Sequence, residues 1–226
     1  VQQWDLVMQE DTKDGEVSLH MITLSVQKAS AGPGEEAGTA EKSGTDSHHP
    51  VRGRLAVCID DSGYDLETQK IYEDMGIPLT LSVMPNQRYT AQSAAEGKAA
   101  GLEIILHQPM ESISETAMEK TTILTSRDDS EIQSVLDDSL SQVPQAIGMN
   151  NHQGSKATAD RRVMQTVMAD LKRRGLFFFD SRTSSRSVGA QEAARAGIGT
   201  VSNELFIDNS TDESSIRARI REAADI

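Results

Sequence analysis

The sequence predicts an α/β fold with a sheet of parallel strands for residues 54–226. Short apolar runs typical of buried strands alternate with segments whose apolar residues recur at helical spacing. Regular alternation of this kind implies right-handed crossover connections between parallel strands. Two architectures fit these observations, a (β/α) barrel and an open doubly wound sheet.

The N-terminal part of the chain has a different character. Residues 1–28 predict a β-hairpin, with strands at 4–8 and 17–26 around an Asp-Gly turn signal. An isolated hairpin is marginally stable in water, so we expect it to pair elsewhere or to be the remnant of an upstream domain. Residues 29–53 lack periodicity and are rich in Gly, Ala, Ser and Glu, which predicts a flexible linker.

The predicted strands are short apolar runs, and each is followed within three residues by Asp, His or Asn. In chain order they cover 54–60, 79–83, 102–106, 146–149, 176–179 and short runs around 199–207. In β/α architectures the functional site lies at the carboxyl ends of the strands. The polar residues after these runs are therefore expected to line one shared site.

The predicted helices separate these strands and carry apolar residues three or four positions apart. They are expected near 65–75, near 89–100, from 128 to about 140, from 158 to 174, near 187–196 and at the C-terminal end. Gly101 and Gly175 are typical helix stops. An acidic start at 128–131 and a basic end at 172–174 suit the helix dipole.

The composition excludes several classes of protein. The formal net charge is −13 at pH 7, which argues against binding of nucleic acid through its phosphates. No apolar run approaches the roughly 20 residues of a membrane-spanning helix, so no membrane span is expected. The single cysteine, Cys58, lies in an apolar run and is expected to be a buried core residue.

Asp60 and Asp61 form a tandem pair at the end of the first predicted strand. Because successive strand residues point to opposite faces, one carboxylate could bind a metal while the other accepts a proton. Asp-Asp-Ser-Gly is also common in turns, so a solvated turn is the alternative interpretation.

His107 and His152 follow two other predicted strands. A single histidine at a strand end is more often a structural residue than a ligand. Together with Asp61, two imidazoles would bind Zn²⁺ or a similar divalent ion and leave positions open for water and substrate. The two histidines are far apart in the sequence, so this site depends on the fold bringing the strand ends together.

Three further residues are candidates for binding substrate. Asp180 and Arg182 follow the phenylalanine-rich strand and could orient a ligand, with a structural salt bridge as the alternative. Asn151, next to His152, is the third candidate.

Five segments carry these candidates along the chain. They are Ile59-Asp-Asp-Ser-Gly63, Leu106-His-Gln-Pro-Met110, Gly148-Met-Asn-Asn-His-Gln-Gly-Ser155, Phe179-Asp-Ser-Arg-Thr183 and Phe206-Ile-Asp-Asn209. In sequence and in order they resemble the divergent polysaccharide deacetylase family (the YibQ-like group), a distant branch of the NodB-type carbohydrate esterases. The resemblance covers about residues 54–209 and implies a distorted (β/α) barrel with a metal-dependent hydrolase site.

The resemblance also implies roles for the candidate residues. Asp60 would be the general base, and Asp61, His107 and His152 would bind a divalent metal ion, with Zn²⁺ expected. The implied substrate is an N-acetylated glycan, and the implied location is the cell envelope. The oligomeric state is not predicted.

The sequence departs from the pattern of the resembled enzymes in two ways. The usual HxxxH segment is absent, so the histidine ligands would come from separate strands. A Gly-His-x-x-Pro segment, whose histidine would be a candidate general acid, is also absent from the sequence. We therefore expect the domain, 54–226, to be truncated at its C-terminal end, the alternative being a barrel that is left open and does not catalyse the reaction.

These departures keep two other functions open. One is a barrel that binds a glycan or another partner without catalysis and retains the geometry of the site. The other is a metal-dependent hydrolase that acts on a different amide or ester.

Overall fold

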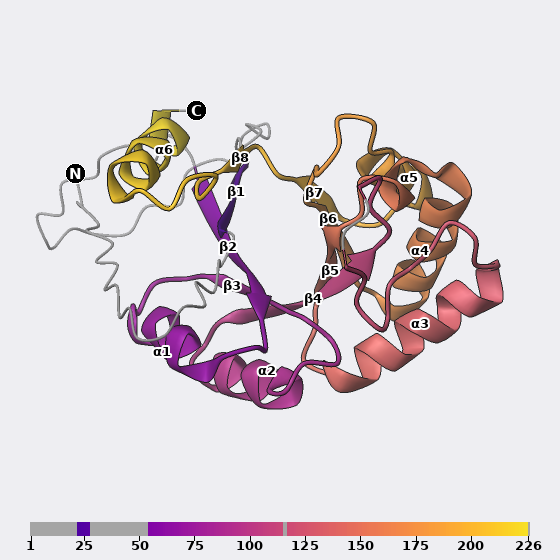
Figure 1. Cartoon of the computed structure of the whole chain (residues 1–226), viewed down its shortest axis with the longest axis horizontal. Helices are drawn as coiled ribbons and strands as arrows, with labels where there is room; N and C mark the ends of the chain where they lie inside the picture. The colour runs from indigo at the N-terminus through magenta and orange to yellow at the C-terminus, as the bar shows by residue number, and fades with distance from the viewer. Residues whose placement is uncertain (1–21, 28–53, 115–116, 226) are drawn as a thin grey trace, which may run out of the picture.

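Eight strands form one curled sheet in the computed structural model, which describes residues 22–27, 54–114 and 117–225. Six of these strands pair in parallel and follow one another in chain order (Figure 1). They are β2 (Arg54–Ser62), β3 (Thr80–Val83), β4 (Glu103–Met110), β5 (Gly148–Gln153), β6 (Phe177–Asp180) and β7 (Thr200–Ser202). The predicted α/β class is confirmed.

The two edge strands show that the sheet is a distorted barrel and not an open sheet. β8 (Leu205–Phe206) lies at one edge and β7 at the other, although only Asn203 and Glu204 separate them in sequence. The edges of a flat sheet of this size would be about 34 Å apart. The chain from Ser202 to Leu205 can span at most about 11 Å. The sheet must therefore curl until its edges come close together, which Figure 1 shows as a ring of strands.

β1 (Ile22–Gln27) lies between β2 and β8 and is antiparallel to both. It overlaps the second strand of the predicted hairpin, 17–26, and it pairs with the parallel strands in one sheet. The first hairpin strand and the predicted linker, 29–53, lie outside the described residues, so both stay predictions.

The helices lie around the outside of the sheet (Figure 1). They are α1 (Leu66–Asp74), α2 (Thr90–Ala99), α3 (Asp129–Gln142), α4 (Arg161–Arg174), α5 (Gly189–Ala196) and α6 (Glu213–Asp225), with a short 3₁₀ helix, η1, at Ala157–Ala159. Side chains of Asp65, Asp128 and Asp160 cap three of the helix N-termini. Within the described ranges, none of the helices is long and apolar enough to cross a membrane.

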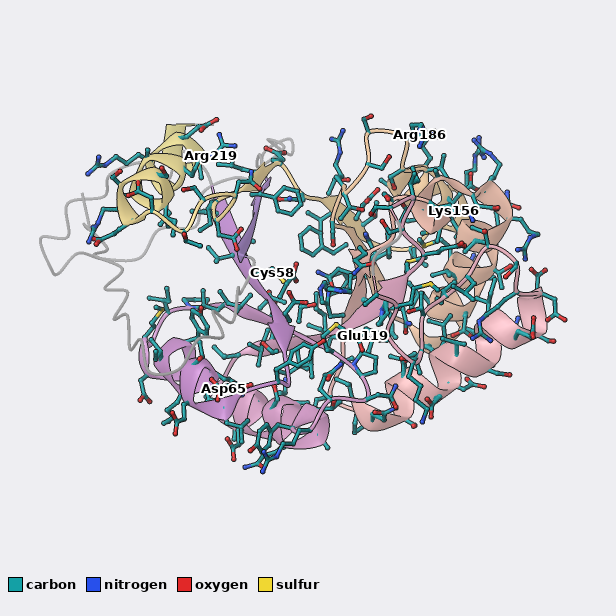
Figure 2. The ribbon with its side chains drawn as sticks, viewed as in Figure 1. Cys58, Asp65, Glu119, Lys156, Arg186 and Arg219 are labelled. Atoms are coloured by element: carbon teal, nitrogen blue, oxygen red, sulfur yellow. The ribbon has the colours of Figure 1, made fainter. Side chains whose placement is uncertain are left out.

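Along each strand, successive residues face alternately toward the helices and toward the interior of the barrel. Ile104 and Leu106 belong to the large core between sheet and helices. Ile105, Cys58 and Phe179 form a separate apolar cluster in the interior, and Figure 2 shows Cys58 inside the ring of strands. Cys58 is a buried free thiol. The interior is thus apolar immediately before the polar residues that form the candidate site.

Candidate metal centre

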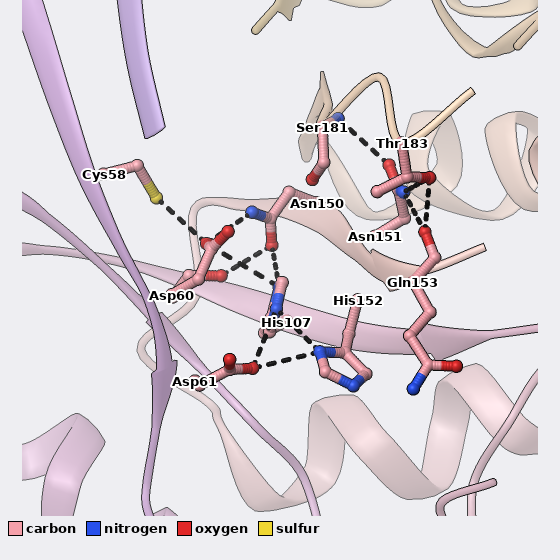
Figure 3. A network of polar contacts seen from close by, with 11 residues as sticks. Cys58, Asp60, Asp61, His107, Asn150, Asn151, His152, Gln153, Ser181 and Thr183 are labelled. Carbon is pink, nitrogen blue, oxygen red and sulfur yellow. Dashed lines mark hydrogen bonds and ion pairs between the residues drawn. The ribbon is translucent and has the colours of Figure 1, made fainter. Parts of the chain in front are cut away.

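A buried polar network lies at the carboxyl ends of β2, β4 and β5 (Figure 3). Strand alternation places His107 on the interior face with Ile105, and His152 on the interior face with Asn150. The parallel register sets His107 beside Asn150, and Pro109 beside His152. The strands continue through these polar residues, so β4 and β5 each extend four residues beyond the predicted apolar runs.

A β-bulge brings both members of the Asp60–Asp61 pair into the same interior. The register between β2 and β3 shifts between Ile59 and Ser62, and Asp61 has a φ of +56°, in the left-handed region. Oδ1 of Asp60 lies 3.8 Å from Nδ1 of His107, and Oδ1 of Asp61 lies 3.3 Å from Nε2 of the same ring. The expectation that the two carboxylates point to opposite faces is therefore wrong, because the bulge interrupts the alternation.

Three ligand atoms converge at the end of this network. Oδ1 of Asp61 is 3.0 Å from Nδ1 of His152, and that nitrogen is 3.2 Å from Nε2 of His107. Among the described residues, this is the group of carboxylates and imidazoles that could hold a metal ion. The fold thus brings together the three ligands predicted from separate strands.

The chemistry of these atoms fits a small divalent cation. Oδ1 of Asp61 is buried, and within the described residues it has no hydrogen bond of acceptable direction, although both histidines lie near it. Ligands about 2.1 Å from a tetrahedral Zn²⁺ are about 3.4 Å from one another. The observed separations of 3.0–3.3 Å are close to that spacing. A metal ion bound here would supply the partner that this carboxylate oxygen lacks and would also bind the two imidazole nitrogens beside it.

The pKa values of two residues in the site are strongly shifted. Burial alone would raise the pKa of Asp61, but contacts with His107 and His152 outweigh burial and hold the pKa of this carboxyl far below its usual range. Burial alone would lower the pKa of His107, but the charge of Asp60 and the contact with Asp61 outweigh it and raise the pKa to about 9. In the metal-free protein the two histidines therefore face a carboxylate that is ionised at neutral pH.

Sequence reasoning missed one buried member of the network, Asn150. Its side chain is fully buried and contacts His107, Asp60 and Ser82. The signal was present in the sequence, because a residue two positions before His152 on a strand must share its face.

The three predicted substrate-binding residues lie outside the ligand cluster. Asn151 faces away from the interior, accepts a hydrogen bond from the backbone N–H of Ser181 and donates one to the carbonyl of Gln153. The carboxylate of Asp180 is buried and accepts from Ser187 and from the backbone of Arg182. The side chain of Arg182 is exposed. Asn151 and Asp180 thus order the loop after β6, and the role of all three residues in substrate binding stays a prediction.

A cleft of about 970 Å³ opens beyond the ends of the strands that carry the histidines. Its lining includes Glu111, just after β4, and Ser155 and Lys156, just after β5. Arg186 lines it from the loop after β6, and Figure 2 shows Lys156 and Arg186 on the same side of the molecule. The cleft is within the size range of small-molecule sites.

Comparison with known proteins identifies the family. The sequence matches the model of the divergent polysaccharide deacetylase family over residues 57–226. This chain belongs to the divergent polysaccharide deacetylase family. The resemblance stated from the five segments is thereby confirmed.

One relative of this deacetylase-family chain is the uncharacterized protein YibQ of Escherichia coli K12, which is 32% identical over 176 residues. The match covers 78% of this chain and 55% of YibQ. It is 30% identical over 173 residues to an uncharacterized protein of Haemophilus influenzae Rd, with 76% and 62% covered. The chain therefore spans less than two thirds of the length of either relative.

A solved structure supports the fold. The crystal structure of an uncharacterized protein from Agrobacterium tumefaciens C58 superposes with a TM-score of 0.68 at 19% identity, over 74% of this chain and 71% of that one. At this identity the likeness shows the distorted barrel alone.

Proposed function

We propose that this protein is a metal-dependent hydrolase that removes acetyl groups from an N-acetylated glycan of the cell envelope. The observation that carries the proposal is the convergence of Asp61, His107 and His152 around one orphaned carboxylate oxygen. Membership of a family named for polysaccharide deacetylation supports the reaction and the substrate class. The glycan and the location are proposals from the family, with Zn²⁺ as the proposed metal.

The chain's own residues divide the work in this proposal. Oδ1 of Asp61, Nε2 of His107 and Nδ1 of His152 would hold the ion. A bound divalent ion lowers the pKa of water and polarises a carbonyl oxygen. Asp60, the neighbouring buried carboxylate, is the proposed proton acceptor, as the resemblance implies.

The test is acetate release from N-acetylglucosamine oligomers by purified protein with added Zn²⁺. We expect release that stops when a chelator removes the metal. Hydrolysis of aryl acetates with no release from the oligomers would favour an enzyme for another amide or ester.

One observation favours a second candidate, a glycan-binding barrel without catalysis. Asp60 is fully buried, and its Oδ1 already accepts hydrogen bonds from Asn150 and Cys58. Zn²⁺-dependent binding of the oligomers in calorimetry with no acetate release would support this candidate over the deacetylase.

The raised pKa of His107 predicts that metal binding releases a proton. With a pKa of about 9, His107 is protonated at pH 7.5 in the metal-free protein, and Nε2 must lose that proton to bind a metal. The apparent affinity for Zn²⁺ should therefore rise with pH below pH 9, by about tenfold per unit for each proton released. Calorimetry in two buffers of different protonation enthalpy measures the number of protons released for each Zn²⁺ ion bound. A count of zero at pH 7.5 would contradict the expectation.

A further inference from the structure

We propose that Asn150 is a positioning residue that fixes His107 in the tautomer needed for metal binding, and that Asp60 sets the orientation of Asn150. This inference rests on the metal site of the proposed function. It assigns a role to a residue that is not one of the three proposed metal ligands.

The contacts of Asn150 define its orientation. Nδ2 of Asn150 donates to Oδ1 of Asp60 over 2.8 Å. Turning the amide by 180° would bring its oxygen against the carboxylate oxygen, where neither atom carries a hydrogen. The carboxylate of Asp60 therefore holds the nitrogen of Asn150 on its own side, and the amide oxygen must face the other way.

The amide oxygen then determines which nitrogen of His107 carries hydrogen. Oδ1 of Asn150 lies 2.7 Å from Nδ1 of His107 and also accepts from Oγ of Ser82 over 2.5 Å. An amide oxygen can only accept, so Nδ1 must be the N–H. In the neutral ring, Nε2 is left with the lone pair, and Nε2 is the atom that faces Asp61 and His152 (Figure 3).

The network is buried and is built from four strands. Its members are Asp60, Ser82, His107 and Asn150, which come from β2, β3, β4 and β5, and each is 0% exposed. The parallel register places Asn150 directly beside His107. The orientation of the His107 ring therefore depends on its contacts with these protein groups. Partners of this kind for metal-bound histidines support affinity, and their removal costs about 10–100-fold.

The test compares Zn²⁺ affinity, measured by competition with a chelator, in three proteins. Asn150→Leu keeps the branched shape of the side chain but removes the acceptor from Nδ1 of His107, and we expect about 10–100-fold weaker binding than in the wild type. Ser82→Ala is the matched control, because it removes a buried donor to the same amide oxygen and leaves the acceptor in place. The control should bind Zn²⁺ almost as tightly as the wild type.

The outcomes separate this inference from the proposed function. Absence of Zn²⁺ binding by the wild-type protein would contradict the metal site itself. Wild-type affinity in a folded Asn150→Leu variant would contradict the role of Asn150 alone.

A second measurement needs no variant and remains decisive if Asn150→Leu does not fold. In ¹⁵N NMR of the Zn²⁺-loaded wild type, we expect Nδ1 of His107 to carry a slowly exchanging hydrogen and Nε2 to show the shift of a metal-bound nitrogen. Hydrogen on Nε2 and metal on Nδ1 would overturn the inference.

Discussion

Replacing both histidines, as His107→Ala/His152→Ala, is expected to abolish stoichiometric metal binding. The wild type should contain about one divalent ion per chain, because Asp61, His107 and His152 supply three of the four ligands of a catalytic zinc site. The double variant keeps a single carboxylate, which cannot hold the ion against exchange with water. Metal content by mass spectrometry, after incubation with Zn²⁺ and gel filtration, measures the effect.

A matched control removes two other histidines. His48→Ala/His49→Ala deletes the same number of imidazoles from the predicted linker, 29–53, and should retain the ion. Retention of the ion in both double variants would show that the ion binds elsewhere and would exclude the proposed site. Circular dichroism of the His107/His152 variant checks that the fold survives.

The general form of this site could be predicted from the sequence because of one physical regularity. Parallel strands bring their carboxyl ends to one side, so polar residues after apolar runs must meet there. His107 and His152 come together for this reason, despite their separation along the chain. The order β2 to β7 follows from the same alternation of strands and helices.

The local geometry of the site could not be predicted in the same way. The bulge at Asp61 depends on a φ of +56°, which no periodicity in the sequence signals. Strict alternation therefore assigned the two carboxylates to opposite faces. The same alternation, applied to β5 and β6, would have predicted correctly that Asn151 and Asp180 face away from the interior, because their neighbours Asn150 and Phe179 face into it.

The closure of the barrel also could not be predicted from local sequence patterns. The insertion of β1 between β2 and β8 is a long-range antiparallel pairing, which no spacing within residues 54–226 signals. Short β7 and β8 belong to opposite edges, although they are almost contiguous in sequence. Such pairings depend on the completed curvature of the sheet.

Asp60→Asn is expected to lower acetate release by about 10²–10⁴-fold, the usual contribution of a positioned general base. The amide cannot accept a proton at neutral pH, but its oxygen can still accept the hydrogen bond from Asn150. Metal content should therefore stay near one ion per chain while turnover falls. The measurement is initial acetate release from N-acetylglucosamine oligomers by Zn²⁺-loaded protein.

A matched control variant, and a comparison of the loss of activity with the loss of metal, determine the role of Asp60. Cys58→Ala removes the thiol that donates to the same carboxylate over 3.5 Å and keeps the carboxylate, so its rate should change little. Full activity in Asp60→Asn would show that another group takes the proton. Joint loss of activity and metal would show that Asp60 acts through Asn150 and His107 instead. A rate loss with the metal retained would identify proton transfer by the Asp60 carboxylate as the lost step, since an asparagine at this position can still accept the hydrogen bond from Asn150.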